Sequence, residues 1–214
     1  MPRLAFSIES AQAVAHAAAP TIAFELVVER VGGDAIRSAT VGVRVDIAPA
    51  RRAYDAGAEA RLAELFGAPA HWDASLGAIP WARTTVLVGP VADRATVELP
   101  VACTYDFDVA SAKYLDALRD GEIPLDFSFS GTVLYDAGGF VQAAPIPWSS
   151  EASYRLPVAV WRQAMAAAFG DTAWIRLPRN AFDRLQAFRV DRGLTSWESA
   201  IETLLDEREG AWIA

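Results

Sequence analysis

Thr21-Ile-Ala-Phe-Glu-Leu-Val-Val-Glu29, Val31-Gly-Gly-Asp34 and Ala39-Thr-Val-Gly-Val-Arg-Val-Asp-Ile47 are the stretches of sequence that decide the fold. In the first and third, apolar residues alternate with polar ones, which is typical of β-strands with one buried face. Gly32 and Gly33 provide the backbone freedom that a tight turn needs. We therefore predict a β-hairpin. Ile36 has the opposite parity from Val41, so the second strand must bulge between Arg37 and Thr40 if both residues are buried.

Composition indicates a globular protein with a substantial core. The chain has 214 residues, of which 53% are hydrophobic, and a formal net charge of −8 at pH 7. A chain of this length can form one large domain, and its hydrophobic content argues against disorder. The negative charge argues against binding to nucleic acid or to anionic lipid, because both require a cationic surface.

The beginning of the chain does not resemble a targeting or membrane segment. Glu9 interrupts the first apolar residues, and the alanine-rich stretch 11–19 contains Gln12 and His16 and is too short to span a bilayer. Cys103 is the only cysteine, so no internal disulfide can form. We expect a soluble, cytoplasmic protein.

Further periodic segments follow along the chain. Alternation predicts strands over residues 4–8, 83–88, 95–99, 125–135 and 140–144. Helical spacing predicts short helices over 58–66 and 109–118, with an irregular loop at 67–80. After Leu156 the period becomes helical, with helices expected after Pro157, after Pro178 and after a capping box formed by Thr195 and Glu198.

Strands first and helices last indicate an α+β fold, an antiparallel β-sandwich followed by a C-terminal helical region. We find no repeat and no linker. We therefore expect a single domain over residues 1–214, with a mainly β-sandwich part with short helices at 1–156 and C-terminal helices packed on it at 157–214.

No set of residues in the sequence forms a catalytic or metal-binding signature. His16, His71 and Cys103 are too far apart in sequence to suggest a zinc or iron site, and no glycine-rich phosphate loop follows a strand. Cys103 lies among apolar residues, so we expect it to pack as a small hydrophobe. We predict no catalytic residue, no metal and no cofactor.

The seven tryptophans suggest protein interaction. Indoles are frequent at the centres of protein interfaces, although they are also ordinary core residues. Trp161 and Trp197 lie on helical apolar stripes and are assigned to the core. Trp148 and Trp174 lie in segments predicted to be irregular, and Pro147 stiffens the first of them. Trp148, Pro147 and Trp174 are therefore the candidate partner-binding residues, and we expect Trp148 to be exposed.

The alternative is a small-molecule binding protein or enzyme. Its carboxylates and tyrosines would line a pocket between the sandwich and the helices, with Tyr105, Asp106, Asp126 and Tyr135 as the candidates. Clustered acidic groups with raised pKa values in a deep cavity would support this alternative.

Several short motifs occur along the chain: Arg51-Arg-Ala-Tyr54, Leu65-Phe-Gly67, Thr104-Tyr-Asp-Phe-Asp108, Ala112-Lys-Tyr-Leu-Asp-Ala-Leu118, Gly121-Glu-Ile-Pro-Leu125, Phe129-Ser-Gly-Thr-Val133, Ile146-Pro-Trp148 and Glu151-Ala-Ser-Tyr-Arg-Leu-Pro-Val-Ala-Val-Trp161. Together they resemble those of an uncharacterised family of bacterial proteins, a domain of unknown function encoded near genes for high-affinity uptake nickel–iron hydrogenases. The resemblance implies a gene context but no activity and no catalytic residue. Together with the tryptophans, it leads us to expect a non-enzymatic accessory protein whose partner is a hydrogenase subunit or a maturation factor.

Overall fold

The computed structural model describes residues 2–103, 109–170 and 177–210. The chain forms two compact units, residues 1–171 and 172–214, and each is described by itself. The expectation of a single domain over the whole chain stays a prediction.

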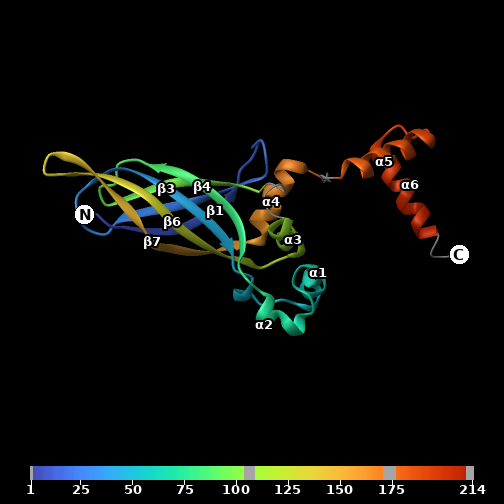
Figure 1. The fold of residues 1–214 in the computed structure, drawn as a ribbon, viewed down its shortest axis with the longest axis horizontal. Coiled ribbons are helices and arrows are strands. Elements are labelled where there is room, and N and C mark those ends of the chain that lie inside the picture. The colour runs from blue at the N-terminus through green and yellow to red at the C-terminus, as the bar shows by residue number, and fades with distance from the viewer. Residues whose placement is uncertain (1, 104–108, 171–176, 211–214) are drawn as a thin grey trace. The chain divides into compact units, whose positions relative to one another are not determined.

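The first unit is a sandwich of two antiparallel sheets, which confirms the predicted fold class. The strands are β1 (Leu4–Ala13), β2 (Thr21–Arg30), β3 (Ile36–Ile47), β4 (Ile79–Val88), β5 (Arg94–Ala102), β6 (Glu122–Ala137) and β7 (Phe140–Pro157). One sheet has the order β1-β2-β5 and the other β4-β3-β6-β7. The helices of this unit gather at one end of the sandwich, and the turn between β6 and β7 lies at the opposite end (Figure 1).

The predicted hairpin is wrong, although both of its strands exist. β2 pairs with β1 and β5, whereas β3 pairs with β4 and β6, so the two strands lie in different sheets. The segment between them, with Gly32 and Gly33 at positive φ, crosses from one sheet to the other. Alternation identifies a strand and its buried face, but both a hairpin and a crossover place the apolar faces of consecutive strands in one core.

The predicted core is confirmed. The alternation of the predicted strands places six side chains in one core, and all of them are at most 3% exposed: Phe24, Leu26, Val43, Val45, Phe127 and Phe129. The ring of Phe24, from the three-stranded sheet, meets the ring of Phe127, from the four-stranded sheet, edge to face with centroids 5.3 Å apart. This contact is one of those that hold the two sheets together.

The register of β3 contains the predicted irregularity. Its pairing with β6 shifts between Ile36 and Ser38. Ile36 and Val41 are both buried despite their opposite parity, because the extra residue in the bulge reverses the alternation.

Short helices cover one end of the sandwich. They are η1 (Pro49–Arg51), α1 (Ala56–Phe66), η2 (Pro69–His71), α2 (Trp72–Ser75), α3 (Val109–Ala117) and α4 (Val158–Phe169). Asp55 caps α1 by accepting a hydrogen bond from the Ala58 amide, and the helix ends at Gly67 with φ +77°. Half of the segment expected to be an irregular loop, residues 69–75 of 67–80, forms η2 and α2. Trp72 is buried there and donates to the Gly67 carbonyl at 3.0 Å.

The second unit contains α5 (Arg179–Asp191) and α6 (Trp197–Gly210). The predicted capping residue of α6 is wrong by one position, since the Ser199 amide donates to the hydroxyl of Ser196 at 3.1 Å. Trp197 contacts Phe182 with ring centroids 5.1 Å apart and lies under the guanidinium of Arg189. It is nevertheless 36% exposed, so its predicted burial is only partial. No helix in the described parts of the chain is long and apolar enough to cross a membrane.

Candidate functional site

The segment around Trp148 belongs to a strand and is not irregular. We expected an irregular segment here, but Pro145, Pro147 and Trp148 lie within β7. Among the described strands, β7 is the last of its sheet and pairs only with β6. Proline is tolerated on such an edge strand because no neighbour there needs its missing amide hydrogen.

A wide bulge exposes Trp148. Phe129 pairs with Ser150 and Gly131 pairs with Ile146, so Ser130 alone lies opposite the three residues 147–149. A bulge turns side chains away from the regular alternation. Trp148 is 88% exposed, which confirms the predicted exposure, while its role in binding stays a prediction.

Gly131 allows β3 and β6 to approach each other beside this bulge. Its φ is +136°, and a Cβ at this position would lie 2.0 Å from the carbonyl oxygen of Thr40. Only glycine fits such a contact. The position of Ser130, and with it the surface between β3 and Trp148, therefore depends on Gly131.

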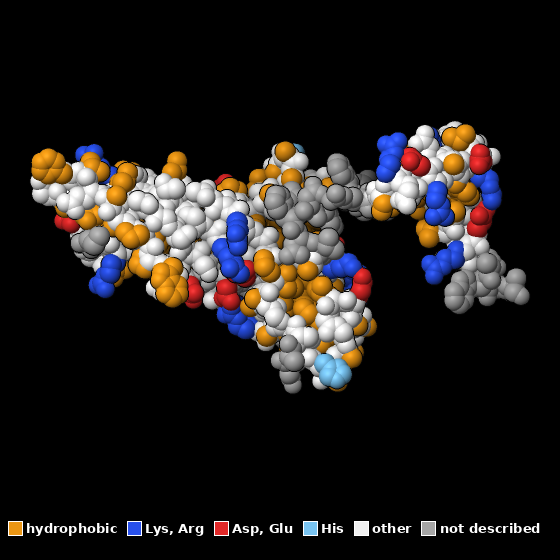
Figure 2. All heavy atoms as spheres, in the orientation of Figure 1, with side chains coloured by type: hydrophobic (Ala, Val, Ile, Leu, Met, Phe, Trp, Pro, Cys, Tyr) orange, Lys and Arg blue, Asp and Glu red, His pale blue; other side chains and the backbone are white. Residues whose placement is uncertain are grey.

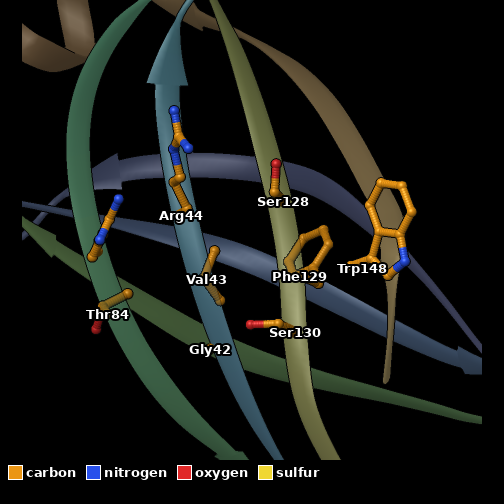
Figure 3. A pocket seen from close by; sticks show the side chains of 9 residues that line it. Gly42, Val43, Arg44, Thr84, Ser128, Phe129, Ser130 and Trp148 are labelled. Carbon is orange, nitrogen blue, oxygen red and sulfur yellow. The ribbon is translucent and has the colours of Figure 1, made fainter. Parts of the chain in front are cut away.

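A shallow groove of about 370 Å³ crosses the outer face of the four-stranded sheet next to Trp148. Ser128 and Ser130 on β6 lie between Arg44 on β3 and Trp148 on β7 (Figure 3). The lining residues come from all four strands of the sheet: Gly42, Val43, Arg44, Arg83, Thr84, Ser128, Phe129, Ser130 and Trp148.

The charge of the groove is positive. Arg44 and Arg83 lie directly opposite each other on β3 and β4. Arg44 donates through Nε to the carboxylate of Asp46, 2.8 Å from Oδ2. The side chain of Arg83 makes no hydrogen bond or ion pair among the described residues, so its guanidinium is free to meet a ligand.

The sequence did not identify Arg44 and Arg83 as site residues. Arg44 stands on the polar face of a predicted strand, and Arg83 stands at the start of another. Nothing in the sequence shows that these strands are neighbours, and only the register places the two side chains together.

Three candidate residues, Trp174, Tyr105 and Asp106, lie outside the described residues. Of the others, Asp126 accepts hydrogen bonds from Arg51 and from the Ser153 hydroxyl. Tyr135 is buried and donates to the Gln142 side chain at 3.1 Å. They are nine positions apart on β6, which corresponds to about 30 Å. The structure therefore does not bring these two candidates for an acidic pocket together.

A hydrogen-bonded tyrosine pair lies under the helices and was not predicted. The hydroxyl of Tyr54 donates to the Pro49 carbonyl at 2.8 Å. Because a tyrosine has one hydroxyl proton, Tyr114 must be the donor in its 2.8 Å contact with Tyr54. Burial raises the pKa of both tyrosines, so both stay protonated at neutral pH. This arrangement satisfies buried polar groups and serves packing.

Cys103 is buried, as expected for a packing residue. It is 4% exposed, and its thiol donates to the Val101 carbonyl at 3.6 Å. Burial raises the pKa of the Cys103 thiol to about 12. A thiol that stays protonated is a poor nucleophile and a poor metal ligand. In the part of the chain that the structure describes, no group of three or more His, Cys, Asp or Glu residues could hold a metal ion.

Ionisation of the Cys103 thiol should lower the free energy of unfolding at alkaline pH. Its pKa is raised in the folded protein from an ordinary value of 9.0, so the stabilisation is complete below pH 9 and is lost as the pH rises toward 12. We expect the thiol by itself to lower the free energy of unfolding by about 2.7 kcal/mol between pH 8 and pH 11, from 1.36 kcal/mol per pH unit above pH 9, and the buried tyrosines to add to this loss. Urea unfolding at both pH values measures the difference. Cys103→Ala should show a clearly smaller loss, and an equal loss in the variant would contradict the assignment.

Comparisons with known proteins place the chain with a family but not with an activity. A family model described as "Family of unknown function (DUF6084)" matches residues 1–212. No functionally curated protein matches the sequence.

Solved structures show only distant likeness. The CARDB domain of a Pyrococcus furiosus protein, solved with di-metal ions, is 13% identical, with 73% of this chain and 87% of that chain covered and a TM-score of 0.29. A putative late embryogenesis abundant protein is 14% identical, with 73% of each chain covered and a TM-score of 0.29. A Kluyveromyces marxianus β-glucosidase is 10% identical over 72% of this chain and 15% of that one, with a TM-score of 0.26. At these scores the likenesses carry no argument about function.

Proposed function

We propose, from the premise that this chain belongs to the DUF6084 family of unknown function, that it is a non-enzymatic interaction protein that binds a protein partner at the groove beside Trp148. The observation that carries the proposal is the bulge in β7, which leaves a large indole 88% exposed at the edge of a groove. A stable fold gains nothing from exposing an indole to water, whereas a binding surface does.

Trp148 can contribute strongly to binding because its side chain has a large apolar area. A tryptophan buries roughly 150–250 Å² when it is covered, with only two side-chain torsions to order. Because Trp148 is held on a strand and directly follows Pro147, little ordering remains to be done on binding. These are the properties of a residue that dominates an interface.

The partner that we put first is a hydrogenase subunit or a hydrogenase maturation factor in the bacterial cytoplasm. This choice follows from the resemblance and its gene context, not from the groove. Co-purification from a bacterium that expresses the protein at its native level identifies the partner. Recovery of no partner, together with unchanged hydrogenase activity in a deletion strain, would contradict the proposal.

Trp148→Ala tests the site. We expect binding to the co-purified partner to weaken by about 2 kcal/mol, or about 30-fold, because the variant removes a central contact. The melting temperature should stay close to that of the wild type, because the side chain is exposed. Calorimetric titration and thermal unfolding measure the two effects.

Phe140→Ala is the matched control, since Phe140 is also on β7 and is 75% exposed but does not line the groove. It should change neither binding nor stability. A large drop in the melting temperature of Trp148→Ala would place that residue among those that hold the fold together and would remove the proposed site.

The second candidate function is small-molecule binding. The observation that favours it is the volume of the groove, about 370 Å³, which lies within the usual range of ligand pockets. A ligand would then use the groove rather than the acidic and tyrosine residues considered above. Quenching of the indole fluorescence by a metabolite extract, lost in Trp148→Ala, would support this alternative.

A further inference from the structure

We propose that the groove beside Trp148 recognises an acidic peptide segment in extended conformation, with two neighbouring carboxylates at Arg44 and Arg83 and an apolar side chain on the indole. This inference rests on the proposed function and specifies the chemistry of the partner. It is supported by the charges of the groove, by the small residues that line it and by the distances between its arginines and Trp148.

Two like charges face each other at one end of the groove. Arg44 and Arg83 are directly opposite in the register of β3 and β4, and like charges in such a pair destabilise a sheet. Of the nine residues that line the groove, these two are charged and none is acidic. Carboxylates placed between the guanidinium groups would replace the repulsion with charge-assisted hydrogen bonds.

The charges around the groove determine which of its ends binds the acidic part of the peptide. Asp46 neutralises part of the charge of Arg44, whereas Arg83 is not paired with any described residue. In the same cross-strand row, Glu151 on β7 lies opposite Ser128 and makes the Trp148 side less favourable for an anion. The acidic part of the ligand should therefore lie over β3 and β4, and its apolar part over β7.

Small residues form the floor between these two ends. Gly42, Ser128 and Ser130 lie between the arginines and Trp148. A Cβ on Gly42 would come within 3.2 Å of the Ser130 hydroxyl, so a side chain at this position would fill part of the groove. The serine hydroxyls can donate to and accept from the backbone of a bound peptide.

The distances between Trp148 and the two arginines determine how far apart the apolar and acidic residues of the peptide must be. Trp148 is two strands from Arg44 and three strands from Arg83, and it lies two residues further along the sheet. With about 4.8 Å between strands and about 3.3 Å per residue, the two distances are roughly 12 Å and 16 Å. An extended peptide covers these distances, with all three side chains on one face, when two acidic residues are separated by one residue and an apolar residue follows the second by about four positions.

Nucleic acid is the less suitable anion. The whole chain carries a net charge of −8, and binding to a polyphosphate depends on many cations spread along a surface. On the face of the molecule shown in Figure 2, Lys and Arg side chains of the first unit lie in small separate groups rather than in a continuous patch. Two arginines beside an indole suit a short acidic segment better.

The test uses the full chain and a synthetic peptide with two glutamates separated by one residue and a leucine four positions after the second. Fluorescence anisotropy of the labelled peptide should show saturable binding that weakens with salt. Arg83→Gln should weaken this binding about tenfold without lowering the melting temperature, because it also removes the repulsion from Arg44. Arg37→Gln is the matched control, since Arg37 is an arginine of the same sheet, on β3, that is paired with Asp136 and does not line the groove; this variant should bind like the wild type.

Two further ligands make the outcome decisive. A peptide of the same composition with leucine directly after the glutamates should bind at least fivefold more weakly, and a short single-stranded DNA should not compete. Absence of peptide binding, equal binding by Arg83→Gln and Arg37→Gln, or equal binding of the DNA would overturn the inference. If Trp148→Ala releases the native partner and Arg83→Gln does not, the inference fails but the proposed function stands. If neither variant releases the partner, both fail.

Discussion

Gly131→Ala is expected to destabilise the protein by about 4 kcal/mol. The new Cβ would lie 2.0 Å from the Thr40 carbonyl oxygen, and the residue would have to keep a φ of +136°. An unfavourable φ costs about 1–3 kcal/mol, and forcing an atom into a packed site costs about as much again. Because the clash is with backbone, it can be relieved only by separating β3 from β6.

Urea unfolding monitored by tryptophan fluorescence measures this effect. Gly89→Ala is the matched control, because a Cβ added at Gly89 would have no heavy atom within 4 Å and this glycine has no positive φ. The control should differ from the wild type by less than about 1 kcal/mol. If Gly131→Ala were equally harmless, the close approach of the two strands beside the Trp148 bulge would be wrong, and so would the groove that depends on it.

Phe127→Ala is expected to cost about 3 to 5 kcal/mol, the usual range for truncating a buried aromatic side chain. Phe127 is fully buried between the sheets, where its ring meets Phe24 at 5.3 Å and Phe129 at 6.5 Å. The truncation leaves a cavity that the surrounding strands can fill only in part. Thermal and urea unfolding should both detect the loss.

Phe140→Ala removes the same side chain from an exposed position on β7 and should change the stability by less than about 0.5 kcal/mol. The difference between the two variants separates burial from the chemistry of the residue. A loss below about 1 kcal/mol for Phe127→Ala would contradict the assignment of the inward face of β6.

One property of the candidate site could be predicted from the sequence, and two could not. The exposure of Trp148 was predictable, because two prolines and an apolar residue without periodic neighbours indicated a segment at the surface. Its position in a strand was not, since the bulge depends on Gly131 and on the pairing of β6 with β7. Arg44 and Arg83 become one feature only through the register of β3 and β4.

The sequence by itself determined the local structure of this protein. Alternation over residues 21–29, 39–47 and 125–135 identified strands and the side that each buries. Gly67 and Gly170, which follow the last residues of α1 and α4, are typical of helix ends. These features follow from interactions between residues close together in the chain, or from the simple need to remove apolar side chains from water.

Only the tertiary structure decided which strands are neighbours. β2 and β3 satisfy the same burial pattern whether they pair in one sheet or face each other across the core, and the structure places them in different sheets. The choice depends on the summed packing of strands far apart in the sequence, such as β3 with β6 and β2 with β5. The groove, the facing arginines and the tyrosine pair are consequences of that choice, because each is made of residues that only the assembled sandwich brings together.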